Sequence, residues 1–206
     1  MSGVKHYHVT YNAIHETIQN TVSKIAEEFD PDILVAIGDG FFPARVMRTF
    51  LRQNTPKTAI QIQAIGLSLY EPLEGSSQEL VGVEVVRTQW LTDSGKVLAG
   101  KHILVVDEVD DTRKTLSYAL AELRKDVEEE IMLRPQAERD ELRKKTTYGI
   151  FVVHNKLKPK LADLPQGVAY YAGANIPDVW LDYPWETIDI REHDLLALED
   201  AKIPLF

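Results

Sequence analysis

The chain contains no cysteine, and this absence removes several classes of chemistry at once. None of its 206 residues is a cysteine. Disulfides, cysteine-ligated metal sites and thiol catalysis are therefore excluded, because each of them requires a cysteine sulfur. The redox compartment is not set by the absence, although an intracellular location is compatible with it.

An excess of basic residues and a long apolar run are also missing. Lys and Arg number 23 against 32 Asp and Glu, which gives a formal net charge of −9. This balance argues against a nonspecific nucleic-acid binder, because such a protein needs a basic face. No apolar run approaches the roughly 20 residues of a membrane span, and residues 1–6 show no signal-peptide core. We therefore expect a soluble, cytoplasmic protein without nucleic-acid or membrane partners.

The apolar residues that are present form short runs separated by helical patterns. With 206 residues, 44% of them hydrophobic, the chain can bury one sizeable core, so a single domain over 1–206 is expected. Four runs have the length of buried strands, at 33–37, 60–67, 103–106 and 149–153. Helical patterns such as 11–28 alternate with them, which predicts an α/β fold with a mainly parallel twisted sheet flanked by helices. In such a sheet the loops after these strands converge on one crevice.

Three segments lie outside this alternation. Residues 70–82 are rich in Pro, Gly, Ser and Glu and predict a mobile loop. Residues 122–145 are charge-dense and broken by Pro135, which predicts a solvated helical excursion. Short strands at 170–172 and 180–181 are expected to belong to a peripheral subdomain.

The segment from Ile103 to Thr115 points to a ligand. The apolar run ends at Asp107 and Glu108, and a polar stretch from Asp111 to Thr115 precedes an apolar helical pattern. Free N–H groups at a helix start bind phosphate, and acids hold sugar hydroxyls or a divalent metal. An ordinary helix cap after a strand is the alternative. The density of acids, hydroxyls and cations favours a site for a phosphorylated, hydroxylated ligand.

The run Asp-Glu-Val-Asp-Asp-Thr-Arg-Lys-Thr at 107–115 resembles the phosphoribosyl-pyrophosphate (PRPP) motif of the type I phosphoribosyltransferases. That motif has two acids and two mostly apolar residues before Asp-Thr-Gly-x-Thr. Asp110 replaces an apolar residue here, and Arg113 replaces the glycine. Loss of the glycine removes easy access to positive φ, whereas the added guanidinium is a good phosphate donor.

Three further blocks, at 44–45, 65–70 and 87–90, resemble the fungal hypoxanthine–guanine and xanthine–guanine enzymes of this family. The resemblance implies a type I phosphoribosyltransferase fold with a flexible hood loop at 70–90 and a base-recognition hood segment at 154–206. It implies that Asp111 is catalytic and that the 5′-phosphate is bound by Asp111, Thr112, Arg113, Lys114 and Thr115. The ribose and metal residues would be Asp107, Glu108 and Glu186, with Asp182 as a lesser alternative. The pyrophosphate residues would be Gly38, Asp39, Gly40, Ser68, Tyr70 and Arg87, and the base residues Lys156, Trp180 and Leu181.

Some of these assignments have competitors. Lys158 and Lys160 compete with Lys156 as the cation that reads the base. Trp180 begins a Trp-x-x-x-Pro-Trp pattern typical of an aromatic clamp on a purine, although an isolated Trp is more often a core residue. Asp39 would repel pyrophosphate, so it either faces away or acts through a metal ion.

The resemblance implies transfer of the 5-phosphoribosyl group from PRPP to a 6-oxopurine, with Mg²⁺ as cofactor and a nucleoside monophosphate as product. It also implies a homodimer or homotetramer. A PRPP- or nucleotide-binding regulator of the same fold, without turnover, is the alternative, supported by Asp39 and Arg113. A receiver-like signalling domain would leave the C-terminal aromatic block at 176–186 unexplained.

Overall fold

The computed structural model describes residues 5–57, 59–70 and 84–203. Most of the predicted hood loop, residues 71–83, lies outside the described residues. The strands are β1 (His6–His8), β2 (Ile33–Ile37), β3 (Gln61–Tyr70), β4 (Glu84–Gln89), β5 (His102–Asp110), β6 (Thr147–Lys156), β7 (Ala169–Ile176) and β8 (Trp180–Asp182). The helices are α1 (Tyr11–Glu28), α2 (Phe41–Asn54), α3 (Ser94–Leu98), α4 (Lys114–Met132), α5 (Gln136–Lys145) and α6 (Ile190–Asp200), with a 3₁₀ turn η1 (Gly38–Gly40).

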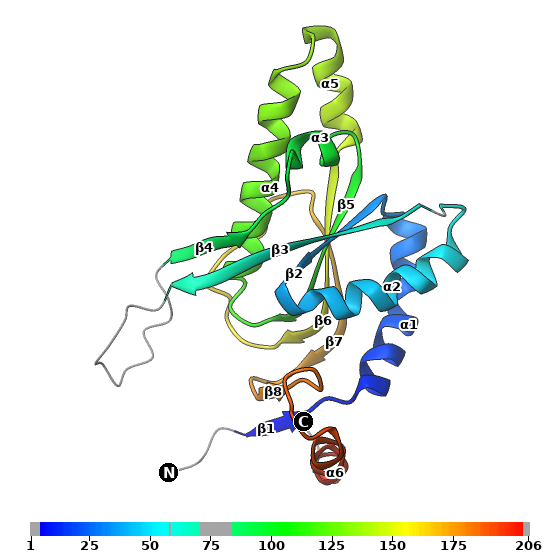
Figure 1. Cartoon of the computed structure of the whole chain (residues 1–206), viewed down its shortest axis with the longest axis vertical. Helices are drawn as coiled ribbons and strands as arrows, with labels where there is room; N and C mark the ends of the chain where they lie inside the picture. The colour runs from blue at the N-terminus through cyan, green and yellow to red at the C-terminus, as the bar shows by residue number, and fades with distance from the viewer. Residues whose placement is uncertain (1–4, 58, 71–83, 204–206) are drawn as a thin grey trace.

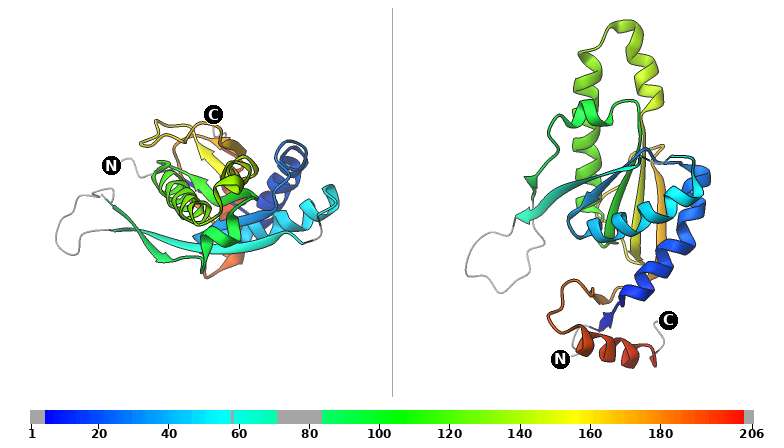
Figure 2. Two further views of the ribbon diagram at one scale, coloured as in Figure 1. Left: turned by 90° about the horizontal axis from the view of Figure 1, so that it is seen from above. Right: turned by 45° about the vertical axis from the view of Figure 1, so that its right-hand side comes forward.

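Six strands form the central sheet, in the order β4-β3-β2-β5-β6-β7. Five of them are parallel, and β4 is an antiparallel edge strand on β3. Helices α1 and α2 pack on one face and α3 and α4 on the other (Figures 1 and 2). The predicted α/β class is confirmed. Because β2 lies between β3 and β5, the sheet has its topological switch point beside β2, where ligands of such folds bind.

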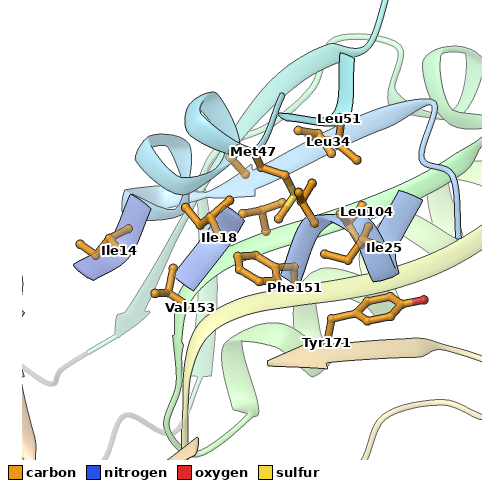
Figure 3. Close-up of a cluster of buried hydrophobic side chains, with 14 of the residues drawn as sticks. Ile14, Ile18, Ile25, Leu34, Met47, Leu51, Leu104, Phe151, Val153 and Tyr171 are labelled. Atoms are coloured by element: carbon orange, nitrogen blue, oxygen red, sulfur yellow. The ribbon is translucent and has the colours of Figure 1, made fainter. Parts of the chain in front are cut away.

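The core on the α1 side follows directly from the helical pattern. Ile14, Ile18, Val22 and Ile25 are buried at spacings of four, four and three residues, as an amphipathic helix requires. Thr10 caps this helix by accepting a hydrogen bond from the backbone N–H of Ala13 at 3.1 Å. Figure 3 shows these isoleucines meeting side chains of α2, β5 and β6.

Strands β5 and β6 are longer than the apolar runs predict. Pairing between them continues past Val106 and Val153, with Asp107 opposite Val152 and Asp110 opposite Asn155. Backbone pairing does not require apolar side chains, so the apolar run marks only the part of each strand buried on both faces. The predicted ends at Val106 and Val153 were therefore wrong.

The charge-dense segment at 122–145 is helical, as predicted, but only partly solvated. Pro135 separates α4 from α5, and α5 has no buried residue. Along α4, however, Leu123, Val127 and Ile131 are buried in the core beneath the helix. The predicted solvated excursion is therefore confirmed for α5 and wrong for one face of α4, where single apolar residues recur at helical spacing among many charged ones.

A small unit lies beyond the carboxyl ends of the central strands. Strand β1 pairs in parallel with β8, and α6 contacts β1 (Figure 1). The peripheral strand predicted at 180–181 is thus present as β8. The one predicted at 170–172 belongs instead to β7, at the edge of the central sheet. Among the described residues, no helix has the length and apolar content needed to cross a membrane.

Candidate active site at the carboxyl ends of the strands

A glycine allows the turn after β2 to touch β5. A Cβ on Gly40 would lie 2.3 Å from the carbonyl oxygen of Val106 and 2.8 Å from the Cα of Asp107, so only glycine fits without a shift. Gly38 has φ +48°, a conformation that glycine adopts readily. This close approach brings Asp39 near Glu108 of β5. Of the four chain segments predicted to converge, those after Ile37 and Val106 are thus close together.

The two acids of β5 are buried in an electronegative environment. Asp107 is 6% exposed, and burial raises its pKa well above the usual range, with the charge of Glu108 adding to the effect. Burial also raises the pKa of Glu108, and the charges of Asp39 and Glu186 act in the same direction. Four carboxyl groups from distant parts of the chain therefore act on one another at this edge, which makes it a strong candidate for a bound cation.

The donor set fits a magnesium ion that arrives with a polyphosphate. The described residues contain no group of three or more His, Asp or Glu side chains arranged to hold a metal unaided. One oxygen of Glu108, Oε2, is buried and has no hydrogen-bond partner in the described part of the chain. Mg²⁺ usually binds through one or two carboxylates together with substrate phosphates, which is what Asp107 and Glu108 offer.

Asp111 lies between two lysines. The Nζ of Lys156 is 2.9 Å from its Oδ2, and the Nζ of Lys158 is 2.6 Å from its Oδ1. Burial alone would raise the pKa of Asp111, but the bonds from Lys158 and Lys156 outweigh it and hold that pKa below the usual range. Lys156 is the last residue of β6 and is buried, because the strand continues past the end at Val153 that the apolar run predicted.

Lys160 has a different role from the other two lysines. Its ammonium donates to the backbone carbonyls of Asp110, Asp111 and Lys156, at 2.6, 3.0 and 2.9 Å. These bonds tie the ends of β5 and β6 together. The ammonium is thus used within the protein, which leaves Lys156 and Lys158 as the cations beside Asp111.

The loop from Asp111 to Arg113 leads into α4, which begins at Lys114 without a side-chain cap. Its first N–H groups are therefore left to other partners, as a phosphate site requires. Thr112 precedes this helix, and Lys114 and Thr115 are its first two residues. Arg113 adopts φ +70°, the region that the family's glycine would favour, and its guanidinium bonds to Asp110.

The C-terminal aromatic block separates into an exposed ring and a stack. Trp180 is 53% exposed and Leu181 is buried. Trp180 is therefore not a core residue, which is what an isolated tryptophan more often is. Trp185 stacks on both Phe42 and Tyr183, with ring centroids 5.2 and 4.8 Å away and planes parallel within 7°. Sequence reasoning missed Phe42 and Tyr183 as site residues; the two adjacent phenylalanines directly after Gly40 were the available signal.

The same stack orients Asp39. The indole Nε1 of Trp185 donates to Asp39 Oδ2 at 3.1 Å, and the hydroxyl of Tyr183 donates to the carbonyl of Glu108 at 3.0 Å. Glu186 follows directly, and its pKa is raised by burial and by the charge of Asp39. The block at 183–186 thus connects the turn after β2 with the acids of β5.

The predicted pyrophosphate residues of the hood lie on two strands, Ser68 and Tyr70 on β3 and Arg87 on β4. Ser68 lies opposite Val86, and Tyr70 opposite Glu84, in the β3–β4 ladder. Arg87 on β4 forms an ion pair with Glu122 of α4 and stacks over the ring of Trp90 at 4.1 Å. In this structure its guanidinium is thus directed at α4, and its contact with pyrophosphate stays a prediction.

Solved structures share this architecture. A hypothetical protein from Neisseria gonorrhoeae with bound ppGpp aligns with a TM-score of 0.75 and 35% identity, covering 97% of this chain and 99% of the other. The hypoxanthine phosphoribosyltransferase of Trypanosoma cruzi in complex with IMP aligns with a TM-score of 0.57 and 19% identity, over 86% and 84% of the two chains. The second likeness shows the fold alone, which is that of a type I phosphoribosyltransferase.

Proteins similar in sequence identify the family to which this chain belongs. The chain is 53% identical to the hypoxanthine-guanine phosphoribosyltransferase of Schizosaccharomyces pombe, over 94% of this chain and 95% of that protein. It is 46% identical to xanthine phosphoribosyltransferase 1 of Saccharomyces cerevisiae, over 92% and 94%. No protein-family model matches the chain. The chain belongs to the purine phosphoribosyltransferase family that contains these fungal enzymes.

Proposed function

We propose that this protein transfers the 5-phosphoribosyl group of PRPP to N9 of a 6-oxopurine, releasing pyrophosphate and forming a nucleoside 5′-monophosphate. The observation that carries the proposal is the pairing of Asp111 with Lys156 at 2.9 Å. N7 and the 6-oxo group are neighbouring atoms on one edge of a purine, so an acceptor and an ammonium at this separation match that edge. The ppGpp bound to the N. gonorrhoeae protein is also a guanine nucleotide.

In the proposed reaction the bond from the anomeric carbon to pyrophosphate breaks while a bond to N9 forms. Positioning and charge stabilisation supply most of the catalysis, since the anomeric carbon passes through an oxocarbenium-like state. Asp111, kept ionised by its lysines, accepts the hydrogen bond of N7–H as N9 attacks. Lys156 donates to the 6-oxo oxygen, Trp180 stacks on the ring, and the backbone at Leu181 reads the purine edge.

The remaining residues hold PRPP. Asp107 and Glu108 would hold the ribose hydroxyls, directly or around Mg²⁺, and Glu186 would be a further metal residue. When bound, Mg²⁺ neutralises charge on the leaving pyrophosphate. The N–H groups at 111–115 bind the 5′-phosphate, and the turn Gly38–Gly40 faces the pyrophosphate. Asp39 would repel a bare pyrophosphate, and a bound metal ion would offset its charge.

Pyrophosphate release from PRPP, measured with each purine in turn, tests the proposal. Turnover with guanine or hypoxanthine is expected. A protein that binds PRPP or guanosine monophosphate but releases no pyrophosphate with any base would be the regulator considered above. The paired carboxylate and lysine at the base edge favour the enzyme, because a regulator has no need of a proton acceptor at N7.

Metal removal should separate catalysis from product binding. With a chelator present, we expect the forward reaction to stop, because pyrophosphate is a poor leaving group without charge neutralisation and Asp39 adds to the repulsion. Guanosine monophosphate carries one phosphate, bound by N–H groups and cations, so calorimetry should still detect its binding. Full turnover in chelator would contradict the role given to Asp107 and Glu108.

Trp180 should contribute base affinity through stacking. By analogy with nucleic-acid-binding proteins, an aromatic–base stack is worth about 1–3 kcal/mol on alanine replacement, so Trp180→Ala should raise the KM for guanine roughly ten- to a hundredfold. Trp180→Phe should keep much of the affinity. Because Trp180 is 53% exposed, its removal leaves no large cavity and should change the Tm little.

A matched control is Leu157→Ala, which truncates a side chain of similar exposure, 56%, beside the same site. It should leave the KM for guanine unchanged. If Trp180→Ala lowers the Tm strongly and spares the KM, the C-terminal block is scaffold and the purine is recognised elsewhere.

A further inference from the structure

The two residues that depart from the family's PRPP motif contact each other. Asp110 stands where an apolar residue is usual, and Arg113 where the motif has glycine. Both Nε and Nη2 of Arg113 donate to Oδ2 of Asp110, at 3.0 and 2.7 Å. The two departures therefore form one structural feature.

Arg113 occupies a backbone conformation that favours glycine. Its φ of +70° and ψ of −2° lie in the left-handed region, where a Cβ crowds the backbone. The loop thus keeps the path that the motif's glycine would give, although the residue there carries a long side chain. Some interaction must hold an arginine in this state, and its ion pair is the evident one.

Asp110 is a fixed partner rather than a surface charge. Its side chain is 0% exposed. The hydroxyl of Tyr170 on β7 donates to Oδ2 at 2.7 Å, and the ammonium of Lys160 lies 3.5 Å from Oδ1. The guanidinium of Arg113 also lies over the ring of Tyr170, 5.1 Å from its centroid. The loop is thus anchored to β5, β7 and the segment after β6 at once.

We propose that Asp110 and Arg113 are positioning residues, a buried ion pair that replaces the motif's glycine and holds the phosphate loop open. The guanidinium is directed into the protein, so the 5′-phosphate is held by backbone N–H groups, Thr112, Lys114 and Thr115, and not by Arg113. This inference rests on the function proposed above, because it assigns the loop at 111–115 to the 5′-phosphate of PRPP and of the nucleotide product.

The decisive comparison is between glycine and alanine at position 113 in a protein whose buried carboxylate at Asp110 has been replaced by valine. In Asp110→Val/Arg113→Gly the pair is replaced by the family's usual residue types, and glycine takes the left-handed backbone freely. The KM for PRPP should stay within about threefold of the parent, because the loop geometry is retained. In Asp110→Val/Arg113→Ala the residue at 113 keeps a Cβ but has no ion pair to hold its left-handed backbone. The KM for PRPP should then rise about tenfold or more, because the free-energy cost of this conformation for a residue with a Cβ corresponds to a change of about that size.

Binding of guanosine monophosphate relative to guanosine gives a second readout that a change in overall stability would not move. Calorimetry isolates the contribution of the phosphate, which should be near the parental value in the glycine double variant and reduced in the alanine one. The KM for guanine should be similar in both. The single variant Asp110→Val should resemble the alanine double variant, because Arg113 also has a Cβ and loses the ion pair that holds its backbone.

Equal losses in the glycine and alanine double variants would overturn the proposal and make Arg113 a direct phosphate ligand. Equal and parental values in both would also overturn it, since the anchor would then be unnecessary. Should the Val background fail to fold, Arg113→Gly and Arg113→Ala with Asp110→Asn give the same comparison, and Asn keeps an acceptor for Tyr170. A parent protein that neither consumes PRPP nor prefers guanosine monophosphate to guanosine would instead refute the proposed function itself.

Discussion

Adenine should be used at least about 10⁴-fold less efficiently than guanine or hypoxanthine, as judged by kcat/KM, because a site built for one polar group rejects its mismatch by about this factor. The buried ammonium of Lys156 would face an amino donor on adenine, where a 6-oxopurine offers an acceptor. The charge would then lose its substrate partner on a side chain that is only 9% exposed. Steady-state kinetics with all four purines measures the ratio; adenine turnover equal to that of guanine would refute this mode of base recognition.

Variants of the neighbouring lysines sharpen this experiment. Lys156→Met should reduce the discrimination against adenine, because the ammonium that penalises the amino group is gone. Lys158→Met is the matched control: Lys158 also contacts Asp111, but it is the more exposed of the two and bonds to Asp178 as well. If Lys158→Met removes the discrimination and Lys156→Met does not, the base is read by Lys158. Hypoxanthine, guanine and xanthine share the 6-oxo group, so this contact does not rank them.

Asp111→Asn should reduce kcat by about 10²–10⁴-fold, the usual contribution of a group that accepts a proton in the transition state. The amide keeps the shape of the carboxyl group but cannot balance the positive charge that forms on the purine as N9 attacks. Binding of guanosine monophosphate should fall much less, since the phosphate loop is retained. An unchanged kcat would leave Asp111 with a structural role at the end of β5.

The control for Asp111→Asn is Asp178→Asn. Asp178 bonds to Lys158 at 2.9 Å and lies 3.9 Å from Lys156, so its removal also unbalances the charges of this cluster. Any general loss of stability or of lysine positioning should appear in both variants, whereas the loss of kcat should appear only in Asp111→Asn. Comparable losses of kcat would point to lysine positioning as the cause.

Local sequence patterns were enough to predict the fold class and to assign a function to the loop at 107–115. A short apolar run is enough to recognise β2, whose five residues are all buried. A spacing of three or four residues between apolar positions is enough to recognise α1. The motif at 107–115 is likewise continuous in the chain, so its residue types could be matched directly. The same local view failed at the ends of β5 and β6, because polar residues continue to pair with a neighbouring strand that the sequence does not show.

The sequence by itself determined an α/β protein and predicted a phosphate loop, a cluster of acids and an aromatic clamp. Only the tertiary structure decided which groups are partners: Lys160 as the tie between two strand ends, Trp185 stacked on Phe42, and Asp110 as the anchor of Arg113. The physical reason is that these choices depend on where strands distant in sequence bring their ends together. Composition records that a lysine or an arginine is present, but only packing fixes which carbonyl or carboxylate lies within hydrogen-bond distance of it.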